Sequence, residues 1–188
     1  MDNRNALLNA ALDLFATRGY DAVGVQEICE AVGVTKPTLY HYFGSKQGLL
    51  KSLLKERFEQ LNQQVRQAAA YSGDLTLNLT RLAEVFFAFA NQNRTFYRMQ
   101  LSMWFSPVGS EPFQMVADWD QQQYQIVEEM FIQAAKDHGN TKGRHQAYAA
   151  TFIGMLNTYI GMSLNGFVAL DADLVYRAVH QFEHGIYS

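Results

Sequence analysis

The sequence is poor in the residues on which small disulfide-linked or zinc-stabilised domains depend. It has a single cysteine, Cys29, among 188 residues. One thiol excludes an internal disulfide and a zinc cluster built from cysteines, and it fits a reducing compartment. Only three prolines interrupt the chain. Long helices are therefore allowed.

Long apolar runs and an excess of positive charge are also missing. The densest apolar run, residues 85–90, is far shorter than the roughly 20 residues that span a membrane. The first residues lack the basic and then apolar pattern of a signal segment. We therefore expect a soluble, cytoplasmic protein. Because the net charge is −3, a nucleic-acid site would depend on a few placed cations rather than on a basic coat.

Helical periodicity is present along nearly the whole chain, with no alternation typical of strands. The pattern predicts an all-α fold. Ser45, Asp74 and Asp171 are placed to cap helices. Beyond residue 45 we expect long helices near residues 46–70, 74–91, 94–105, 112–137, 143–168 and 171–186.

Residues 24–46 have the layout of a helix-turn-helix DNA reader. Gly24 is expected to cap a first short helix and Gly33 to end it. Thr35 is expected to cap a second short helix, which Gly44 ends. Leu39 and Phe43 should point inward. That leaves the outward face of this recognition helix to Lys36, Thr38, Tyr40, His41 and Tyr42.

These residues resemble the TetR/AcrR family of bacterial transcriptional repressors. The resemblance covers about the first quarter of the chain and is carried by Leu14-Phe15-Ala16, Gly19-Tyr20, residues 31–35, residues 38–43 (Thr-Leu-Tyr-His-Tyr-Phe) and Lys46. It implies a helix-turn-helix DNA-binding domain at residues 1–46 and an effector-binding and dimerisation domain at residues 47–188. The implied function is a DNA-binding regulator, expected to be a repressor that a small, largely apolar effector releases from a near-palindromic operator.

The family likeness also implies which residues touch DNA. It places base contacts at Lys36, Pro37, Thr38, Tyr40 and His41, and phosphate contacts at Thr35, Tyr42 and Lys46. A lysine at the start of a recognition helix can donate to guanine, and a threonine can bond to a base edge. Gly24 stands where the family usually has Thr or Ser, so only a backbone contact with phosphate is expected there.

Residues 82–131 are rich in aromatic and methionine side chains. Such residues form ordinary core, and they also line apolar ligand pockets. The family resemblance implies an effector in this region. The expected lining is Phe86, Phe89, Tyr97, Met103, Trp104, Trp119, Tyr124, Met155 and Tyr159.

Small residues recur every seven positions towards the C-terminus. Burial within one subunit would explain the pattern, whereas the family likeness implies a homodimer formed by the last two helices. The expected interface residues are Ala147, Gly154, Gly161, Val168, Leu174, Ala178 and Phe182. A dimer would place its two recognition helices about 34 Å apart, one turn of DNA.

Other functions find less support in the sequence. His180 and His184 are one helical turn apart, a spacing that can bind a metal. A cationic histidine near a helix end is the favoured explanation, and we expect neither metal nor cofactor. Cys29 is interpreted as a small packed residue, with redox sensing as the alternative.

An enzyme would need a nucleophile with its base, or a carboxylate–histidine cluster, and neither is evident. A repressor or scaffold that has lost its ligand stays open.

Overall fold

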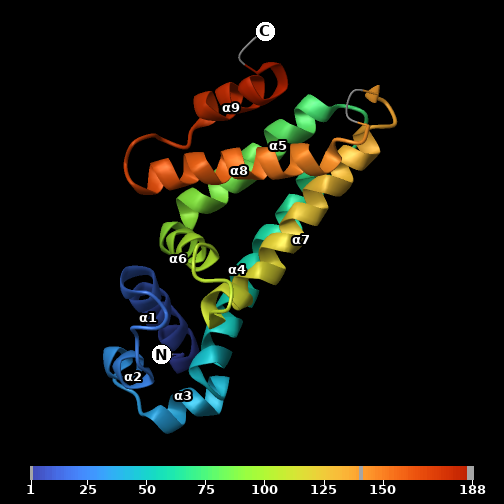
Figure 1. Cartoon of the computed structure of the whole chain (residues 1–188). Coiled ribbons are helices and arrows are strands. Elements are labelled where there is room, and N and C mark those ends of the chain that lie inside the picture. The colour runs from blue at the N-terminus through green and yellow to red at the C-terminus, as the bar shows by residue number, and fades with distance from the viewer. Residues whose placement is uncertain (1, 140–141, 186–188) are drawn as a thin grey trace. The chain divides into compact units, whose positions relative to one another are not determined.

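The computed structural model describes residues 2–139 and 142–185, and every regular element within them is a helix (Figure 1). The predicted all-α fold is confirmed. The helices are α1 (Asn3–Arg18), α2 (Val25–Val32), α3 (Lys36–Phe43), α4 (Lys46–Ala68), α5 (Leu75–Gln92), α6 (Arg94–Trp104), α7 (Glu111–Ala134), α8 (His145–Leu164) and α9 (Ala172–His184). In this described part of the chain, no helix is long and apolar enough to cross a membrane.

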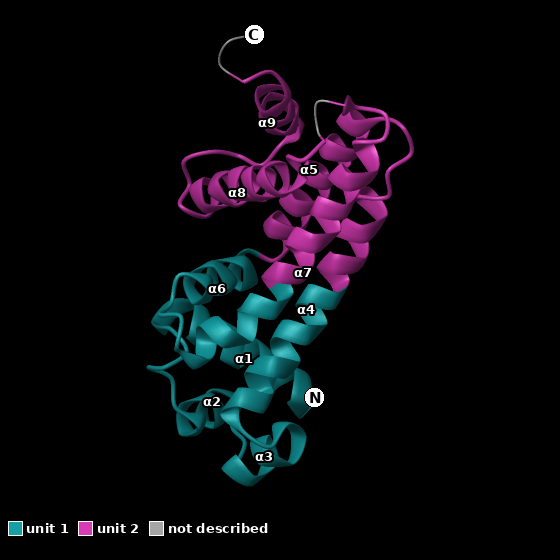
Figure 2. Ribbon diagram, turned by 45° about the vertical axis from the view of Figure 1, so that its right-hand side comes forward, with its two compact units in different colours: residues 1–59, 94–119 teal, residues 60–93, 120–188 magenta. Residues whose placement is uncertain are grey.

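The chain forms two compact units (Figure 2). Unit 1 comprises residues 1–59 and 94–119, and unit 2 comprises residues 60–93 and 120–188. The boundary expected between residues 46 and 47 falls at the start of α4, within unit 1. Unit 1 reaches further because α1 packs against α6 as well as against α2 and α3.

The largest differences between the expected and observed helix ends are at the C-terminal ends of α8 and α7. α8 stops at Leu164 rather than at residue 168, because the chain turns at Gly166 with a φ of +80° and the amide of Phe167 bonds back to the carbonyl of Met162 at 3.0 Å. α7 ends at Ala134 rather than at residue 137. α9 ends at His184, and the expected end at residue 186 lies outside the described residues.

The side-chain caps expected at Ser45, Asp74 and Asp171 are confirmed. The carboxylates of Asp74 and Asp171 accept hydrogen bonds from backbone amides three residues later, each at 2.9 Å. The hydroxyl of Ser45 accepts from the amide of Gly48 at 2.9 Å. Each cap satisfies an amide that has no partner within its own helix.

Unit 1 is organised around the inner face of α1. Leu7, Ala11 and Phe15 of that helix are almost completely buried, as are Ile28 of α2 and Leu39 of α3. The rings of Phe58 on α4 and Trp119 on α7 stack at 5.4 Å. These contacts hold the short helices that carry the candidate DNA-binding face.

Unit 2 buries a core rich in phenylalanine. α5 packs against α8 and α9. Phe86, Phe131 and Phe152 are at most 1% exposed. The end of α4 and α7 lie side by side (Figures 1 and 2), and the hydroxyl of Tyr71 donates to Asp137 at 3.0 Å. The aromatic composition of the sequence therefore serves largely as ordinary core.

Candidate nucleic-acid interface

The turn between α2 and α3 follows from local chain geometry. Gly24 takes the N-cap position of α2 in an extended conformation. Gly33 ends α2 with a φ of +74°, in the left-handed region that favours glycine. Thr35 precedes α3 in an extended conformation, and Pro37 lies in its first turn. The predicted helix-turn-helix is present at the expected residues.

Two buried side chains anchor α3 and leave the rest of it exposed. Leu39 is fully buried and Phe43 is 8% exposed, whereas Tyr40 is 45% and Tyr42 is 41% exposed. Because both anchors lie on one side of the helix, its other side faces solvent. Of the other expected contact residues, Gly24, Thr35, Lys36, Pro37 and His41 are exposed and Thr38 is half-buried.

Thr35 caps α3 by position but not by bonding. Its hydroxyl oxygen lies 3.1 Å from the hydroxyl oxygen of Thr38, and its side chain makes no capping hydrogen bond to the helix. The expected N-cap position of Thr35 is therefore confirmed, without a capping hydrogen bond from its side chain. Thr38, one turn further along α3, takes the place of the backbone amide as the partner of the Thr35 hydroxyl. Both hydroxyls lie at the end of the helix that would enter a groove first.

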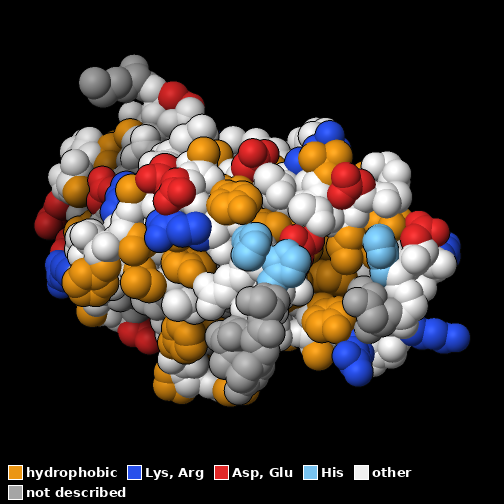
Figure 3. Space-filling model, turned by 90° about the horizontal axis from the view of Figure 1, so that it is seen from above, with side chains coloured by type: hydrophobic (Ala, Val, Ile, Leu, Met, Phe, Trp, Pro, Cys, Tyr) orange, Lys and Arg blue, Asp and Glu red, His pale blue; other side chains and the backbone are white. Residues whose placement is uncertain are grey.

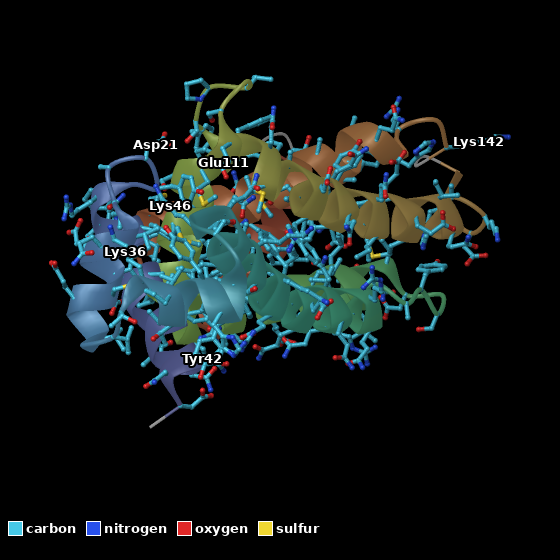
Figure 4. All side chains as sticks on the ribbon, turned by 90° about the horizontal axis from the view of Figure 1, so that it is seen from below. Asp21, Lys36, Tyr42, Lys46, Glu111 and Lys142 are labelled. Atoms are coloured by element: carbon cyan, nitrogen blue, oxygen red, sulfur yellow. The ribbon has the colours of Figure 1, made fainter. Side chains whose placement is uncertain are left out.

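Lys46 is folded back within unit 1 rather than extended towards solvent. Its ammonium nitrogen lies 3.9 Å from the centre of the Tyr20 ring, and the Tyr20 hydroxyl donates to Glu111 at 3.0 Å. Figure 4 shows Lys46 on the same side as Asp21 and Glu111, away from Tyr42. In this conformation Lys46 interacts with an aromatic ring, so it would have to leave the ring to reach the expected phosphate.

The pKa values in this cluster follow from its burial. Burial lowers the pKa of the Lys46 amine, an effect that the carboxylates of Asp21 and Glu111 oppose. Burial and the hydrogen bond to Glu111 raise the pKa of the Tyr20 phenol. The phenol therefore stays protonated and can donate to the carboxylate.

Other cations of unit 1 are engaged in ion pairs. Arg4 pairs with Glu56 at 2.6 Å, and Arg18 pairs with Glu27. These pairs limit the positive charge that the head offers to DNA. Lys36, exposed at the first position of α3, is consequently the cation best placed to approach a base.

Cys29 is packed in the interior, as expected. It is 1% exposed. Burial raises the pKa of its thiol, with the charge of Lys36 acting in the opposite direction. A buried thiol that resists ionisation is a poor nucleophile. The redox-sensing alternative therefore finds no support here.

Gly48 is a structural residue that the sequence patterns did not reveal. A Cβ atom built on Gly48 would lie 1.9 Å from the backbone carbonyl oxygen of Phe43. Only glycine lets α4 start so close to the end of α3. The signal in the sequence was the presence of glycine in the first turn of a helix. Most other residues form helices more readily, so glycine at such a position suggests that a side chain would not fit.

The nine expected effector contacts are divided between the two units. Phe86, Phe89, Tyr124, Met155 and Tyr159 belong to unit 2, and Tyr97, Met103, Trp104 and Trp119 belong to unit 1. Phe86, Phe89, Tyr97 and Met103 are at most 2% exposed, and Trp104 is 40% exposed. Their shared role in ligand binding stays a prediction.

Two hollows in unit 2 are lined by other residues. A hollow of about 460 Å³ lies between α7 and the C-terminal end of α4 with the residues that follow it; we call it the α4–α7 hollow. It is lined by Arg66, Ala69, Ala70, Tyr71, Gln122, Gln125, Ile126, Glu129, Met130 and Gln133. A second, of about 380 Å³, includes Phe131, Tyr148 and Phe182 in its lining. Both volumes fall in the range of small-molecule sites.

The expected dimer contacts divide into exposed and buried positions. Ala147 and Gly154 are exposed, Gly161, Val168 and Phe182 are half-buried, and a Cβ on either glycine would meet no atom within 4 Å. Leu174 and Ala178, by contrast, are at most 3% exposed. α9 turns its apolar face towards its own unit, where it packs on α5, and the interface role expected for these two residues stays a prediction. Val168 lies beyond the end of α8.

The outer face of α9 carries exposed polar and aromatic side chains. Tyr176 is 66% exposed, and the rings of His180 and His184 lie 4.4 Å apart. Histidines and hydrophobic side chains also share the face shown in Figure 3. Among residues 2–139 and 142–185, no group of three or more His, Cys, Asp or Glu side chains is arranged to hold a metal ion.

The known proteins to which the chain is similar are transcriptional regulators. Residues 7–53 match the sequence model of the bacterial regulatory proteins of the tetR family. The chain is similar to the transcriptional activator FasR of Mycolicibacterium smegmatis, with 38% identity over 98 residues. It is similar to the transcriptional repressor KstR2 of Rhodococcus jostii, with 34% identity over 79 residues.

The curated relatives are matched in part and the solved structures throughout. The matches span 52% of this chain and 45% of FasR, and 42% of this chain and 39% of KstR2. A structure of FadR from Bacillus subtilis in complex with stearoyl-CoA superposes with a TM-score of 0.81 at 18% identity, covering 97% of this chain and 99% of that one. At this identity the likeness establishes the fold.

Proposed function

Because the chain belongs to the TetR family of bacterial regulatory proteins, we propose that it is a sequence-specific DNA-binding transcriptional regulator rather than an enzyme. It binds a near-palindromic operator as a homodimer, and a small, largely apolar effector releases it. The observation that carries this proposal is α3, which two buried residues anchor while its polar and aromatic face stays exposed.

Several side chains of α3 have roles that their chemistry supports. Lys36 donates to guanine and Thr38 bonds to a base edge, since both lie in the first turn of the helix. The Tyr42 hydroxyl donates to a phosphate, and the backbone at Gly24 contacts another at the start of α2. Lys46 adds a phosphate contact when it leaves the Tyr20 ring.

Dimerisation supplies the affinity that one head lacks. The head is not generally basic, and two of its arginines are held in ion pairs. Few phosphate contacts per subunit give weak binding, and joining two heads makes the second contact intramolecular. The exposed stripe of Ala147 and Gly154 on α8 is the proposed interface.

The effector acts through unit 2. The phenylalanine-rich core of that unit and the stearoyl-CoA bound by FadR, which shares the fold, support an apolar ligand. A ligand that binds one conformation more tightly shifts the population towards it. Repression is proposed because a protein bound at an operator obstructs transcription without needing a further partner.

Operator binding is tested with the DNA upstream of the protein's own coding sequence. Fluorescence anisotropy should show a loss of roughly tenfold or more in affinity for Thr38→Ala and for Tyr42→Ala, as expected when a hydrogen bond to a charged or base group is removed. Thr95→Ala, at an exposed position of α6, is the control and should bind like the wild type. Unchanged binding by both α3 variants would contradict the assigned site.

A further inference from the structure

Two buried carboxamides lie on the faces of α4 and α7 that line the α4–α7 hollow. Asn62 precedes Arg66 by one helical turn, and Gln123 precedes Ile126 by three residues. Residues three or four apart share a face of a helix. Both residues therefore lie about one helical turn before residues that line the hollow, and they are buried beneath the surface.

The register of the two helices brings these residues to the same level. α4 and α7 run in the same direction along this stretch (Figure 1). The Phe58 ring of α4 stacks on the Trp119 ring of α7. Asn62 and Gln123 each come four residues later in their own helix, one turn beyond that stacked pair. They consequently face the same space between the helices.

Neither carboxamide is satisfied by the protein. Asn62 is 1% exposed and Gln123 is 3% exposed. Within the part of the chain that the structure describes, both amide atoms of Asn62 and the amide nitrogen of Gln123 have no hydrogen-bond partner. Asn78, buried in the same unit, differs: its amide nitrogen donates to the carbonyls of Ala68 and Ala70 at 2.7 Å and 3.1 Å.

The surroundings define the group that would satisfy the two amide nitrogens. Three apolar neighbours along the chain are fully buried. Leu61 directly precedes Asn62, Val65 lies about one turn after Asn62, and Val127 lies one turn after Gln123. Both carboxamides are uncharged and their buried neighbours along the chain include these apolar side chains, so an uncharged hydrogen-bonding group is the matching partner. A carbonyl oxygen has two lone pairs and can accept one hydrogen bond from each amide nitrogen.

We propose that Asn62 and Gln123 form the polar end of the effector site and bind the carbonyl oxygen of an uncharged, otherwise apolar molecule. The inference rests on the proposed function in that the bound molecule is the effector. The apolar part of that molecule occupies the space next to Met130 and Ile126. The two carboxamides select molecules with a carbonyl, because an alkane would leave them without partners.

The first test compares two buried asparagines by thermal unfolding. Asn62→Leu removes polar atoms that have no protein partner, so the Tm should be unchanged or higher. Asn78→Leu removes two hydrogen bonds and should lower the Tm by about 2–4 °C for each. An equal loss of Tm in both variants would give Asn62 an ordinary structural role and would overturn the proposal.

The second test uses acetophenone and ethylbenzene, which differ mainly in the carbonyl group. Dissociation constants are measured by protein NMR, with the side-chain amide signals of Asn62 and Gln123 as reporters. The wild type should bind the ketone more tightly, by a factor of about two to ten for each of the two neutral hydrogen bonds. Asn62→Leu and Gln123→Leu should each reduce that preference, and the double variant should remove it. Equal affinity of the wild type for the two probes would sink the proposal.

Neither test uses DNA. A protein that discriminates the ketone but binds no operator would retain the carbonyl site and lose the proposed regulatory function. A protein that binds its operator and does not discriminate the probes would keep the regulatory function and lose this site.

Discussion

At the scale of single residues, the closest constraint is the approach of Gly48 to Phe43. The Ser45 hydroxyl caps the amide of Gly48, and the missing Cβ leaves room for the carbonyl of Phe43. This glycine therefore sets how α4 follows the recognition helix. Gly24 differs, since an added Cβ meets nothing within 4 Å and its φ of −90° suits any residue.

We expect Gly48→Ala to lower the free energy of unfolding by about 1–3 kcal/mol, because backbone atoms must move to admit the methyl group. Gly24→Ser is the control, and it should be neutral or stabilising by a few tenths of a kcal/mol, since serine caps a helix better than glycine. Urea denaturation of the variants measures both. A Gly48→Ala variant as stable as the wild type would refute the close approach.

At the scale of elements, α9 shows how a capped amphipathic helix is positioned. Asp171 caps its first turn, and Leu174, Val175, Ala178 and Val179 bury its inner face. Asp173, also in the first turn, pairs with Arg177 on the surface at 3.0 Å. The two aspartates have the same charge and lie two residues apart, but one caps the helix and the other forms a surface ion pair. Replacing each in turn therefore distinguishes the contribution of the cap from that of the ion pair.

We expect Asp171→Ala to cost about 1 kcal/mol and to lower the Tm by roughly 2–4 °C, because an amide of the first turn loses its acceptor. Asp173→Ala should cost less than about 1 kcal/mol, since it loses only an exposed ion pair. Differential scanning calorimetry resolves the two. A larger loss for Asp173→Ala would show that surface charge, rather than the cap, holds the helix.

At the scale of the whole molecule, the proposed activity depends on joining two weakly basic heads. The exposed side of α8 bears small residues with open space beside them. Small side chains allow a second helix to approach closely, and a large charged one would prevent it. Dimerisation and DNA affinity should therefore fail together when this stripe is altered.

We expect Gly154→Arg to shift the protein from dimer to monomer in sedimentation velocity, without a loss of helix content. Its DNA affinity should fall at least as far as that of Thr38→Ala, and the dependence of affinity on salt should become shallower, because fewer phosphates are contacted at once. Ala88→Arg, at an exposed position of α5, should remain dimeric. A monomeric wild type would contradict the proposed assembly.

The sequence by itself determined the all-helical fold and the outward face of α3. It also determined the helix-turn-helix, in which Gly24 and Gly33 bound α2 and Thr35 precedes α3. These depend on nearest neighbours along the chain: glycine at a left-handed position, caps, and apolar residues at helical spacing. The same local rules located the caps at Ser45, Asp74 and Asp171.

Tertiary structure alone decided which partner each side chain meets. It placed Lys46 on the ring of Tyr20, buried Leu174 and Ala178 against α5, divided the aromatic residues between two units, and left Asn62 and Gln123 unsatisfied between α4 and α7. Helical periodicity shows that a face is apolar, and it does not show which neighbour covers that face. Contacts between helices distant in sequence depend on packing, which the pattern along one helix does not encode.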